Sequence, residues 1–135
     1  MPLSDYEQIQ NHLAKYCFRV DRGTADEIAE LFWEDAFLDL YGQHQGIAAI
    51  HTAYVNWIRD MRDPVEGLRH CIAQPCIAID GDEATSECYV DADAHTRKKG
   101  RLIQLRALYK DRLTKRHGEW RFTDRRIVVF RSPLE

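Results

Sequence analysis

Hydrophobic residues in the N-terminal part of the chain recur at helical spacing. Ser4 and Glu7 form a capping box and Gly23 is a typical helix end, so the pattern predicts a helix between them. Its apolar face comprises Ile9, Leu13, Tyr16, Cys17 and Val20. A second capping box, Thr24 with Glu27, predicts a shorter helix directly afterwards. Each helix should bury its apolar face against another element.

Later segments change to a strand pattern. A strand-like segment at residues 36–41 precedes a third amphipathic helix at residues 47–61. From Leu68 onward the hydrophobic period is two, which is the spacing of β-strands. The strand-like segments are Leu68–Ile79, Ala84–Thr96, Arg101–Leu113 and Glu119–Phe130. Short polar turns separate them, so consecutive strands should pair antiparallel, and Pro75 predicts an edge strand or a bulge.

Helices followed by a meander of strands are typical of an α+β fold. The chain has 135 residues, the size of one domain, and no linker or repeat divides it. We therefore expect a single domain over residues 1–135, in which a curved antiparallel sheet wraps as a cone around three N-terminal helices. Such a cone would enclose a pocket for a small, mostly apolar molecule.

Composition and charge narrow the range of partners. The net charge is −3 and the pI is about 6.1, which argues against nucleic acid as an obligate partner. The basic run at residues 97–99 ends in Gly100 and is interpreted as a solvated turn. No apolar stretch is long enough for a membrane span and the N-terminus lacks signal-peptide features, so a cytoplasmic protein is expected. All four cysteines fall in apolar segments, where buried, reduced thiols are expected.

Asp21 and His70 are the first candidates for chemistry. Asp21 lies four residues after Cys17, so it extends the buried face of the first helix near a helix end that disfavours negative charge. Violations of local rules concentrate at functional sites, although an exposed Asp21 that opens a turn fits the spacing equally well. His70 alternates with apolar residues, where a packed core histidine is the more common role. If the two meet, the carboxylate would orient the imidazole for general-base chemistry.

Three further side chains could assist. His95 shares a strand face with other polar residues, which indicates either a solvated face or the lining of a wet pocket. Tyr16 and Tyr41 could donate protons, although core packing accounts for both. The histidines lack the spacing of a zinc site, and the sequence contains no phosphate-binding loop, nucleophile elbow or dinucleotide motif. No metal and no cofactor are therefore expected.

Five segments together resemble the SnoaL-like branch of the nuclear transport factor superfamily. They are residues 16–23, 31–36, 46–50, 79–84 and 118–122. The resemblance covers nearly the whole chain and implies a cone-shaped α+β barrel. Some members are cofactor-free enzymes, among them scytalone dehydratase, hexachlorocyclohexane dehydrochlorinase and bile-acid 7α-dehydratase. Others are subunits or transport factors without chemistry of their own, so the fold alone does not define a function.

The resemblance also implies roles for particular residues. In the first two enzymes an inward aspartate and a histidine stand at positions that Asp21 and His70 would occupy, and His95 falls near a second histidine of scytalone dehydratase. Tyr16 precedes Asp21 by five residues, like a tyrosine of the bile-acid enzyme. The expected function is a cofactor-independent lyase, of the dehydratase type that performs β-elimination, or an isomerase. There His70 would remove a proton, Asp21 would orient it, and Tyr16, Tyr41 or His95 would donate one.

The alternative is a non-catalytic ligand-binding or subunit-like domain with a structural Asp–His pair. For the enzyme, the pocket wall is expected from Phe18, Phe37, Leu40, Tyr54, Trp57, Ile103, Leu105 and Phe130. Such a lining suits a small aromatic, steroid-like, terpenoid or polyketide-like molecule. A homodimer is expected, by resemblance and because Leu102, Arg106 and Leu108 give one sheet face a mixed character.

Overall fold

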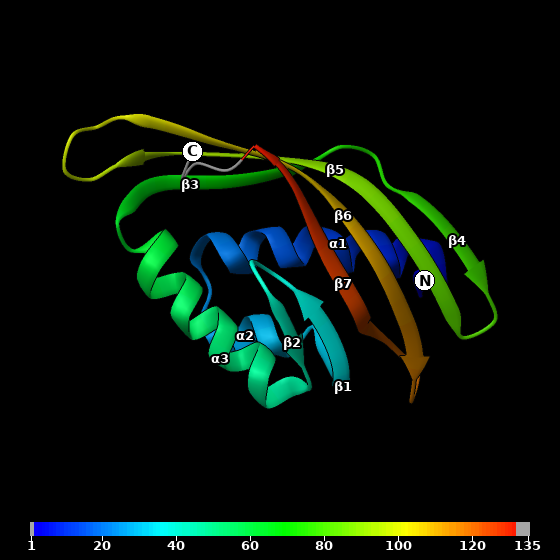
Figure 1. Cartoon of the computed structure of the whole chain (residues 1–135). Helices are drawn as coiled ribbons and strands as arrows, with labels where there is room; N and C mark the ends of the chain where they lie inside the picture. The colour runs from blue at the N-terminus through cyan, green and yellow to red at the C-terminus, as the bar shows by residue number, and fades with distance from the viewer. Residues whose placement is uncertain (1, 132–135) are drawn as a thin grey trace.

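Three helices lie against the concave side of a curved sheet (Figure 1). In the computed structural model, which describes residues 2–131 and only the backbone of the last of these, helix α1 (Asp5–Arg22) begins at the predicted capping box. Glu7 N donates to Ser4 Oγ at 3.1 Å, and Ser4 N donates to the Glu7 carboxylate at 3.1 Å. Helix α2 (Ala25–Ala29) has the second predicted box, and α3 (Ile47–Trp57) continues into a π-helical turn, Ile58–Arg62.

The sheet is open and mostly antiparallel. Its strands are β1 (Phe32–Asp39), β2 (Gln43–Gln45), β3 (Val65–Ile72), β4 (Cys76–Asp80), β5 (Glu83–Thr96), β6 (Leu102–Arg116) and β7 (Glu119–Arg131). Their spatial order is β2-β1-β7-β6-β5-β3, and β4 also pairs with β5. The α+β class, the three helices and the single domain are as the sequence predicts, and the three long strands follow one another as an antiparallel meander.

Three details of the sheet differ from the prediction. The segment Leu68–Ile79 is two strands, β3 and β4, because the chain leaves the ladder around Pro75, which has no amide hydrogen to donate. Both strands pair only with β5 and therefore form the predicted edge. Strand β1 starts earlier than predicted, at Phe32, and pairs in parallel with β7. That pairing joins segments far apart in the sequence, which local patterns do not reveal.

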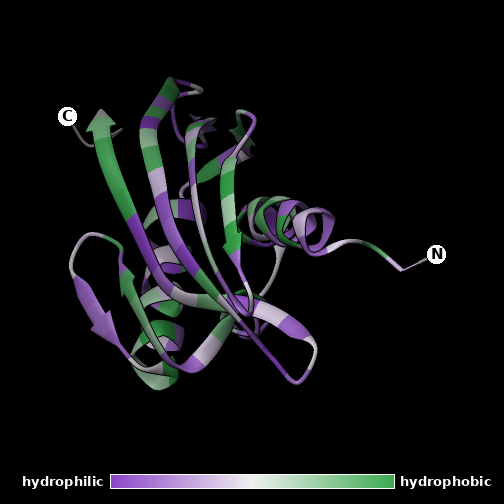
Figure 2. Cartoon of the chain, turned by 90° about the vertical axis from the view of Figure 1, so that its right-hand side faces the viewer, coloured by the Kyte–Doolittle hydropathy of each residue, from purple (hydrophilic) through white to green (hydrophobic). Residues whose placement is uncertain are grey.

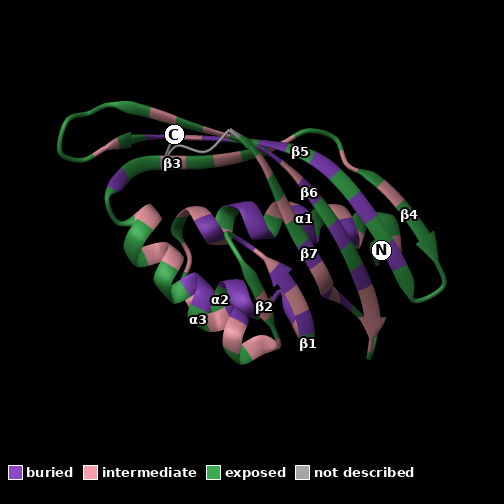
Figure 3. Cartoon of the chain, in the orientation of Figure 1, coloured by how far each residue is buried: buried purple, intermediate pink, exposed green. Residues whose placement is uncertain are grey.

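The long strands separate a buried inner face from an exposed outer face. Buried and exposed positions alternate residue by residue along β5 (Figure 3). Figure 2 shows a different pattern in β7, where a hydrophilic stretch is followed by a hydrophobic one that runs nearly to the end of the strand. The inner face packs against α1 around the fully buried side chains of Leu13, Phe32 and Phe122. The outer face exposes Tyr89, Leu102, Val128 and Phe130.

The cysteines divide along the same two faces. Cys17 and Cys88 are buried as predicted, whereas Cys71 and Cys76 are exposed, so the prediction of four buried thiols is wrong for these two. They lie opposite Asp91 and Glu87 at outward-facing positions of the edge strands. None of the four forms a disulfide. Within residues 2–131, no helix combines the length and the apolar character needed to cross a membrane.

Candidate active site

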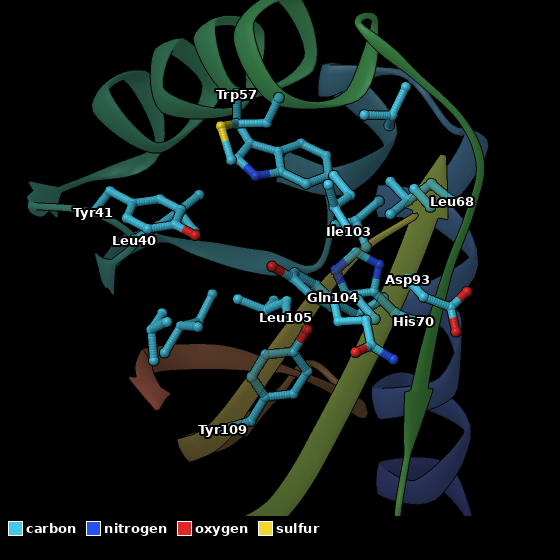
Figure 4. A pocket seen from close by; sticks show the side chains of 18 of the residues that line it. Leu40, Tyr41, Trp57, Leu68, His70, Asp93, Ile103, Gln104, Leu105 and Tyr109 are labelled. Atoms are coloured by element: carbon cyan, nitrogen blue, oxygen red, sulfur yellow. The ribbon is translucent and has the colours of Figure 1, made fainter. Parts of the chain in front are cut away.

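A mostly apolar cavity of about 70 Å³ lies between the inner face of the sheet and helix α3. Its apolar wall includes Val20, Leu40, Trp57, Met61, Leu68, Ile103, Leu105 and Ile127. Figure 4 shows Trp57 and Tyr41 on the side opposite Tyr109, with His70 extending in from β3. The volume exceeds the roughly 15 Å³ that holds one water molecule. The cavity therefore has room for several water molecules or a small chemical group next to the imidazole.

Asp21 and His70 form a hydrogen-bonded pair at this cavity. His70 Nδ1 donates to Asp21 Oδ1 at 2.7 Å, and the backbone N–H of His70 donates to the same carboxylate at 3.1 and 3.2 Å. The side chains are 12% and 6% exposed. Because a carboxylate accepts, the Nδ1 atom carries the proton and Nε2 of the neutral ring is the free acceptor. This is the arrangement that a general base requires.

Local features of the chain place the two side chains together. Asp21 continues the buried face of α1, and its negative charge near the helix C-terminus is compensated by the His70 amide. Arg62 Nη1 donates to the carbonyls of Val20 and Gly23, which satisfies the end of the helix. In β3 the register against β5 shifts near Gly67, which has φ 67°. A bulge of this kind re-aims the side chains that follow it, and here it precedes His70.

A pair of tyrosines borders the same cavity. The hydroxyls of Tyr16 and Tyr54 lie 2.5 Å apart and either can be the donor. Burial raises the pKa of Tyr16 to about 12, and burial also raises the pKa of Tyr54 well above its ordinary value. Both phenols therefore remain protonated at neutral pH and can donate hydrogen bonds.

A buried ion pair, Asp111 with Arg125, lies beneath these tyrosines. Arg125 Nε and Nη2 donate to the two Asp111 oxygens at 2.7 and 3.0 Å, and both side chains are fully buried. The guanidinium lies 4.1 Å from the ring centre of Tyr16 and 4.0 Å from that of Tyr109. Sequence analysis missed this pair. Alternation offered a signal for half of it, because Asp111 shares the inward parity of β6 with buried Tyr109.

Most of the predicted wall residues line the cavity. The wall residues that do so are Leu40, Tyr54, Trp57, Ile103 and Leu105. Among the predicted catalytic residues, Tyr16, Tyr41 and His70 also line the cavity, and Asp21 borders it through its contact with His70. Tyr41 is 52% exposed. Sequence analysis did not single out the lining residues Met61, Asp93, Gln104, Tyr109 and Ile127.

Four predicted site residues lie elsewhere, and their placement corrects the prediction. His95 is exposed on the outer face, because Ala92 and Ala94 take the inward positions of β5. Phe18 is 58% exposed beside Arg22 on α1.

The other two are aromatic residues of the sheet. Phe37 packs under the Arg126 guanidinium, 4.8 Å from its ring centre. Phe130 is 57% exposed on the outer face near Tyr89, with the two ring centres 6.4 Å apart. In the part of the chain that the structure describes, no group of three or more His, Cys, Asp or Glu side chains is placed to hold a metal ion.

Helices packed into the concave face of a curved, open sheet define the α+β class called cystatin-like, and the Asp–His pair marks a site within it. The sequence profile of the SnoaL-like domain matches residues 1–126, and the chain belongs to this family. No curated protein sequence matches the chain.

Solved structures agree on the fold. A protein of unknown function with a cystatin-like fold from Nostoc punctiforme is 25% identical, with full coverage of both chains and a TM-score of 0.82. A candidate scytalone dehydratase from Novosphingobium aromaticivorans is 22% identical over 94% of this chain and 85% of that one, with a TM-score of 0.82. A hexachlorocyclohexane dehydrochlorinase from Novosphingobium barchaimii is 15% identical over 93% and 86%, with a TM-score of 0.76.

Proposed function

We propose that this protein is a cofactor-independent lyase or isomerase that acts on a small, mostly apolar molecule through general acid–base chemistry. The observation that carries the proposal is the 2.7 Å contact between Asp21 and His70 at the wall of an apolar cavity. The names of two structural neighbours, a candidate dehydratase and a dehydrochlorinase, are consistent with elimination chemistry.

In the proposed reaction His70 Nε2 removes a proton from a carbon next to an electron-withdrawing group. The imidazolium that forms is stabilised by the Asp21 carboxylate, which also holds the tautomer. In a β-elimination the C–H electrons form the new double bond, and the leaving hydroxyl departs as water after protonation. In an isomerisation the proton returns to a different carbon instead.

The proton donor in this proposal is one of the tyrosines. Tyr16, which is paired with Tyr54, is a protonated phenol at this cavity, and the Tyr41 hydroxyl belongs to a residue of the cavity wall. His95 is not part of the proposal, because it is exposed on the other face of the sheet. The apolar wall around Trp57 favours an aromatic, steroid-like, terpenoid or polyketide-like substrate.

The test starts from a thermal-shift screen of such compounds and follows any hit by chemical turnover. We expect His70→Gln to lower turnover by about 10³- to 10⁴-fold, and Asp21→Asn by about 10²-fold or more, because each removes part of the general base. The matched controls are His95→Gln and Asp91→Asn, the same changes at exposed positions.

Two outcomes distinguish the proposal from its alternative. Turnover that is lost in the two site variants and kept in both controls supports the enzyme. Turnover that survives in correctly folded His70→Gln protein overturns it. The pair would then be structural, as expected for a non-catalytic ligand-binding or subunit-like domain.

The homodimer and the cytoplasmic location stay predictions. The outer face that carries Leu102, Arg106 and Leu108 also exposes Tyr89 and Phe130, so we propose this face as the dimer contact. Light scattering after size-exclusion chromatography should give twice the chain mass of 15.8 kDa, and Tyr89→Ser with Phe130→Ser should shift it toward one chain. A single-chain mass for the unaltered protein would contradict the homodimer.

A further inference from the structure

The hairpin between β5 and β6 concentrates positive charge in an otherwise acidic protein. Four cationic side chains occur within residues 97–101, whereas the whole chain has a net charge of −3. Arg97 has a carboxylate partner, Glu66, with their atoms 3.6 Å apart. Among the residues that the structure describes, no carboxylate lies within ion-pair distance of Lys98, Lys99 or Arg101. Within residues 2–131, three cations on one turn therefore have no carboxylate partner.

These side chains belong to an exposed hairpin tip and also line a groove beside it. The groove has a volume of about 520 Å³ and is formed by Pro64, Val65, Thr96, Arg97, Lys98, Lys99 and Arg101. In Figure 1 the hairpin extends beyond the start of β3, and Pro64 and Val65 form the facing wall. Residues 97–101 are exposed, as the sequence predicts for a solvated turn, and the groove lies along one side of this turn.

The hairpin is fixed in place by hydrogen bonds. Arg97 N donates to Pro64 O at 3.0 Å, and Arg97 Nε donates to Asp63 O at 2.8 Å. Within the turn, Gly100 N donates to Thr96 O at 2.8 Å, and Arg101 N donates to Thr96 Oγ1 at 3.0 Å. The backbone φ of 62° at Gly100 favours glycine there. A turn held at both ends presents its charges in a defined position, which lowers the ordering cost of binding.

The groove adjoins the cavity that contains His70. Val65 lines both. Ala94 lines the cavity and Thr96 lines the groove, two residues or about 7 Å further along β5. That distance is comparable to the length of a bicyclic aromatic ring. A ligand that extends out of the cavity along β5 by about this length would reach the groove.

We infer that the groove binds an anionic group, a carboxylate or a phosphate, carried by the ligand of the neighbouring cavity. The inference rests on the proposed function for the cavity itself and adds a charge requirement to its substrate. The substrate is thus an amphipathic anion, with an apolar body beside His70 and its charge at Lys98, Lys99 and Arg101. The apolar stems of these side chains suit the junction between body and charge.

The test compares three compounds with one ring system: 2-naphthol, which is neutral at pH 7, 2-naphthoate and 2-naphthyl phosphate. Calorimetric titration of the unaltered protein at about 0.05 M salt should give anion affinities about five- to tenfold above that of 2-naphthol. The gap should narrow at about 0.5 M salt, because the groove is exposed to solvent. A preference between the two anions identifies the group as carboxylate or phosphate.

Paired variants locate the effect. Lys98→Gln with Lys99→Gln should bring the anion affinities down to that of 2-naphthol and leave 2-naphthol binding unchanged. The control, Lys110→Gln with Arg112→Gln, removes the same charge from exposed positions on the outer face and should keep the preference.

The contrary outcomes separate this inference from the proposed function. Equal affinities for all three compounds, or equal losses in both variant pairs, would overturn the inference and leave the proposed lyase or isomerase standing. Failure of all three compounds to bind would overturn the inference together with ligand access to the cavity. Loss of turnover in His70→Gln is measured independently of both.

Discussion

Two aspartates in this protein form side-chain pairs that have the same contact distance and different surroundings, Asp21 with His70 and Asp111 with Arg125. Asp21 lies 2.7 Å from His70, and Asp111 lies 2.7 Å from Arg125. The first pair borders a cavity, whereas the second is fully buried and its guanidinium is covered by aromatic rings. The contact geometry alone does not distinguish a catalytic pair from a structural one. Access for a ligand does.

The two pairs also differ in what they contribute to the folded state. A fully buried charge whose partner is removed is left uncompensated in a medium of low dielectric constant, which is strongly destabilising. A pair beside a cavity keeps access to water and can change its protonation during a reaction. We therefore expect substitutions at Asp111 to act on stability and substitutions at Asp21 to act on turnover.

The largest loss of stability should come from breaking the fully buried pair of Asp111 and Arg125. Asp111→Asn leaves the Arg125 guanidinium without its counter-charge, and we expect unfolding to become easier by about 3–5 kcal/mol. Urea denaturation at pH 7 measures this change. Asp21→Asn is the matched control, and it should cost about 1 kcal/mol, because its carboxylate is nearer to solvent. Equal losses in the two variants would contradict the distinction between the pairs.

Replacing both Asp111 and Arg125 is a second test of the same comparison. Asp111→Leu with Arg125→Met removes the buried charges together, so this variant should recover most of the stability that Asp111→Asn loses. The corresponding double change at the cavity, Asp21→Leu with His70→Met, should not recover turnover. A double variant at Asp111 and Arg125 as unstable as the single one would mean that the aromatic contacts of Arg125 dominate.

The same two regions show how much the sequence could predict. The capping boxes, the helices and the long strands follow from local patterns. For Asp21 the helical spacing allowed an inward position and an exposed turn equally, and only the tertiary contact with His70 decides between them. Strand alternation is reliable only where no bulge intervenes. In β7 the register shifts opposite Leu113, so even positions such as Phe122 face inward before the shift and odd positions such as Arg125 afterwards.

That shift accounts for two errors at once. It turns Phe130 to the outer face, although the sequence predicted it in the pocket wall, and it brings Arg125 into the core, where nothing local predicts a charge. Along β5 no such shift occurs after Ala92, so the exposed position of His95 follows from simple parity. The resemblance to scytalone dehydratase placed His95 at the site, and this was wrong. The alternation of inward and outward residues along β5 gives its exposed position correctly.

The buried histidine His12 provides the next test. His12 Nε2 donates to Leu31 O at 3.0 Å, and burial lowers the pKa of His12 from 6.5 to about 4. Between these values the unfolded chain binds a proton that the native chain does not, so stability falls as the pH falls. The loss should reach about 3 kcal/mol from pH 6.5 to 4, and above pH 6.5 this histidine should contribute no pH dependence.

Urea unfolding at a series of pH values measures this slope. His12→Gln keeps a donor for Leu31 O and should flatten the slope below pH 6.5, with only a modest change at pH 7. His95→Gln is the control, because it makes the same change at an exposed position. If the stability of the unaltered protein and of His12→Gln depended on pH in the same way, burial would not lower the pKa of His12 as we expect.

The smallest loss of stability is expected at Tyr16, which contacts the buried Arg125 and also lines the cavity. Its ring covers the Arg125 guanidinium, and its hydroxyl lies 2.5 Å from that of Tyr54 at the cavity. Tyr16→Phe keeps the ring and removes the hydroxyl, so we expect a loss of about 1 kcal/mol from the broken hydrogen bond. If this hydroxyl donates the proton in the reaction, turnover should also fall about 10²-fold, since general acid catalysis contributes at least that much. Tyr54→Phe breaks the same hydrogen bond and is the control for stability. A stability loss without any change in turnover would mean that the Tyr16 hydroxyl has a structural role only. Tyr41 would then remain as the candidate proton donor.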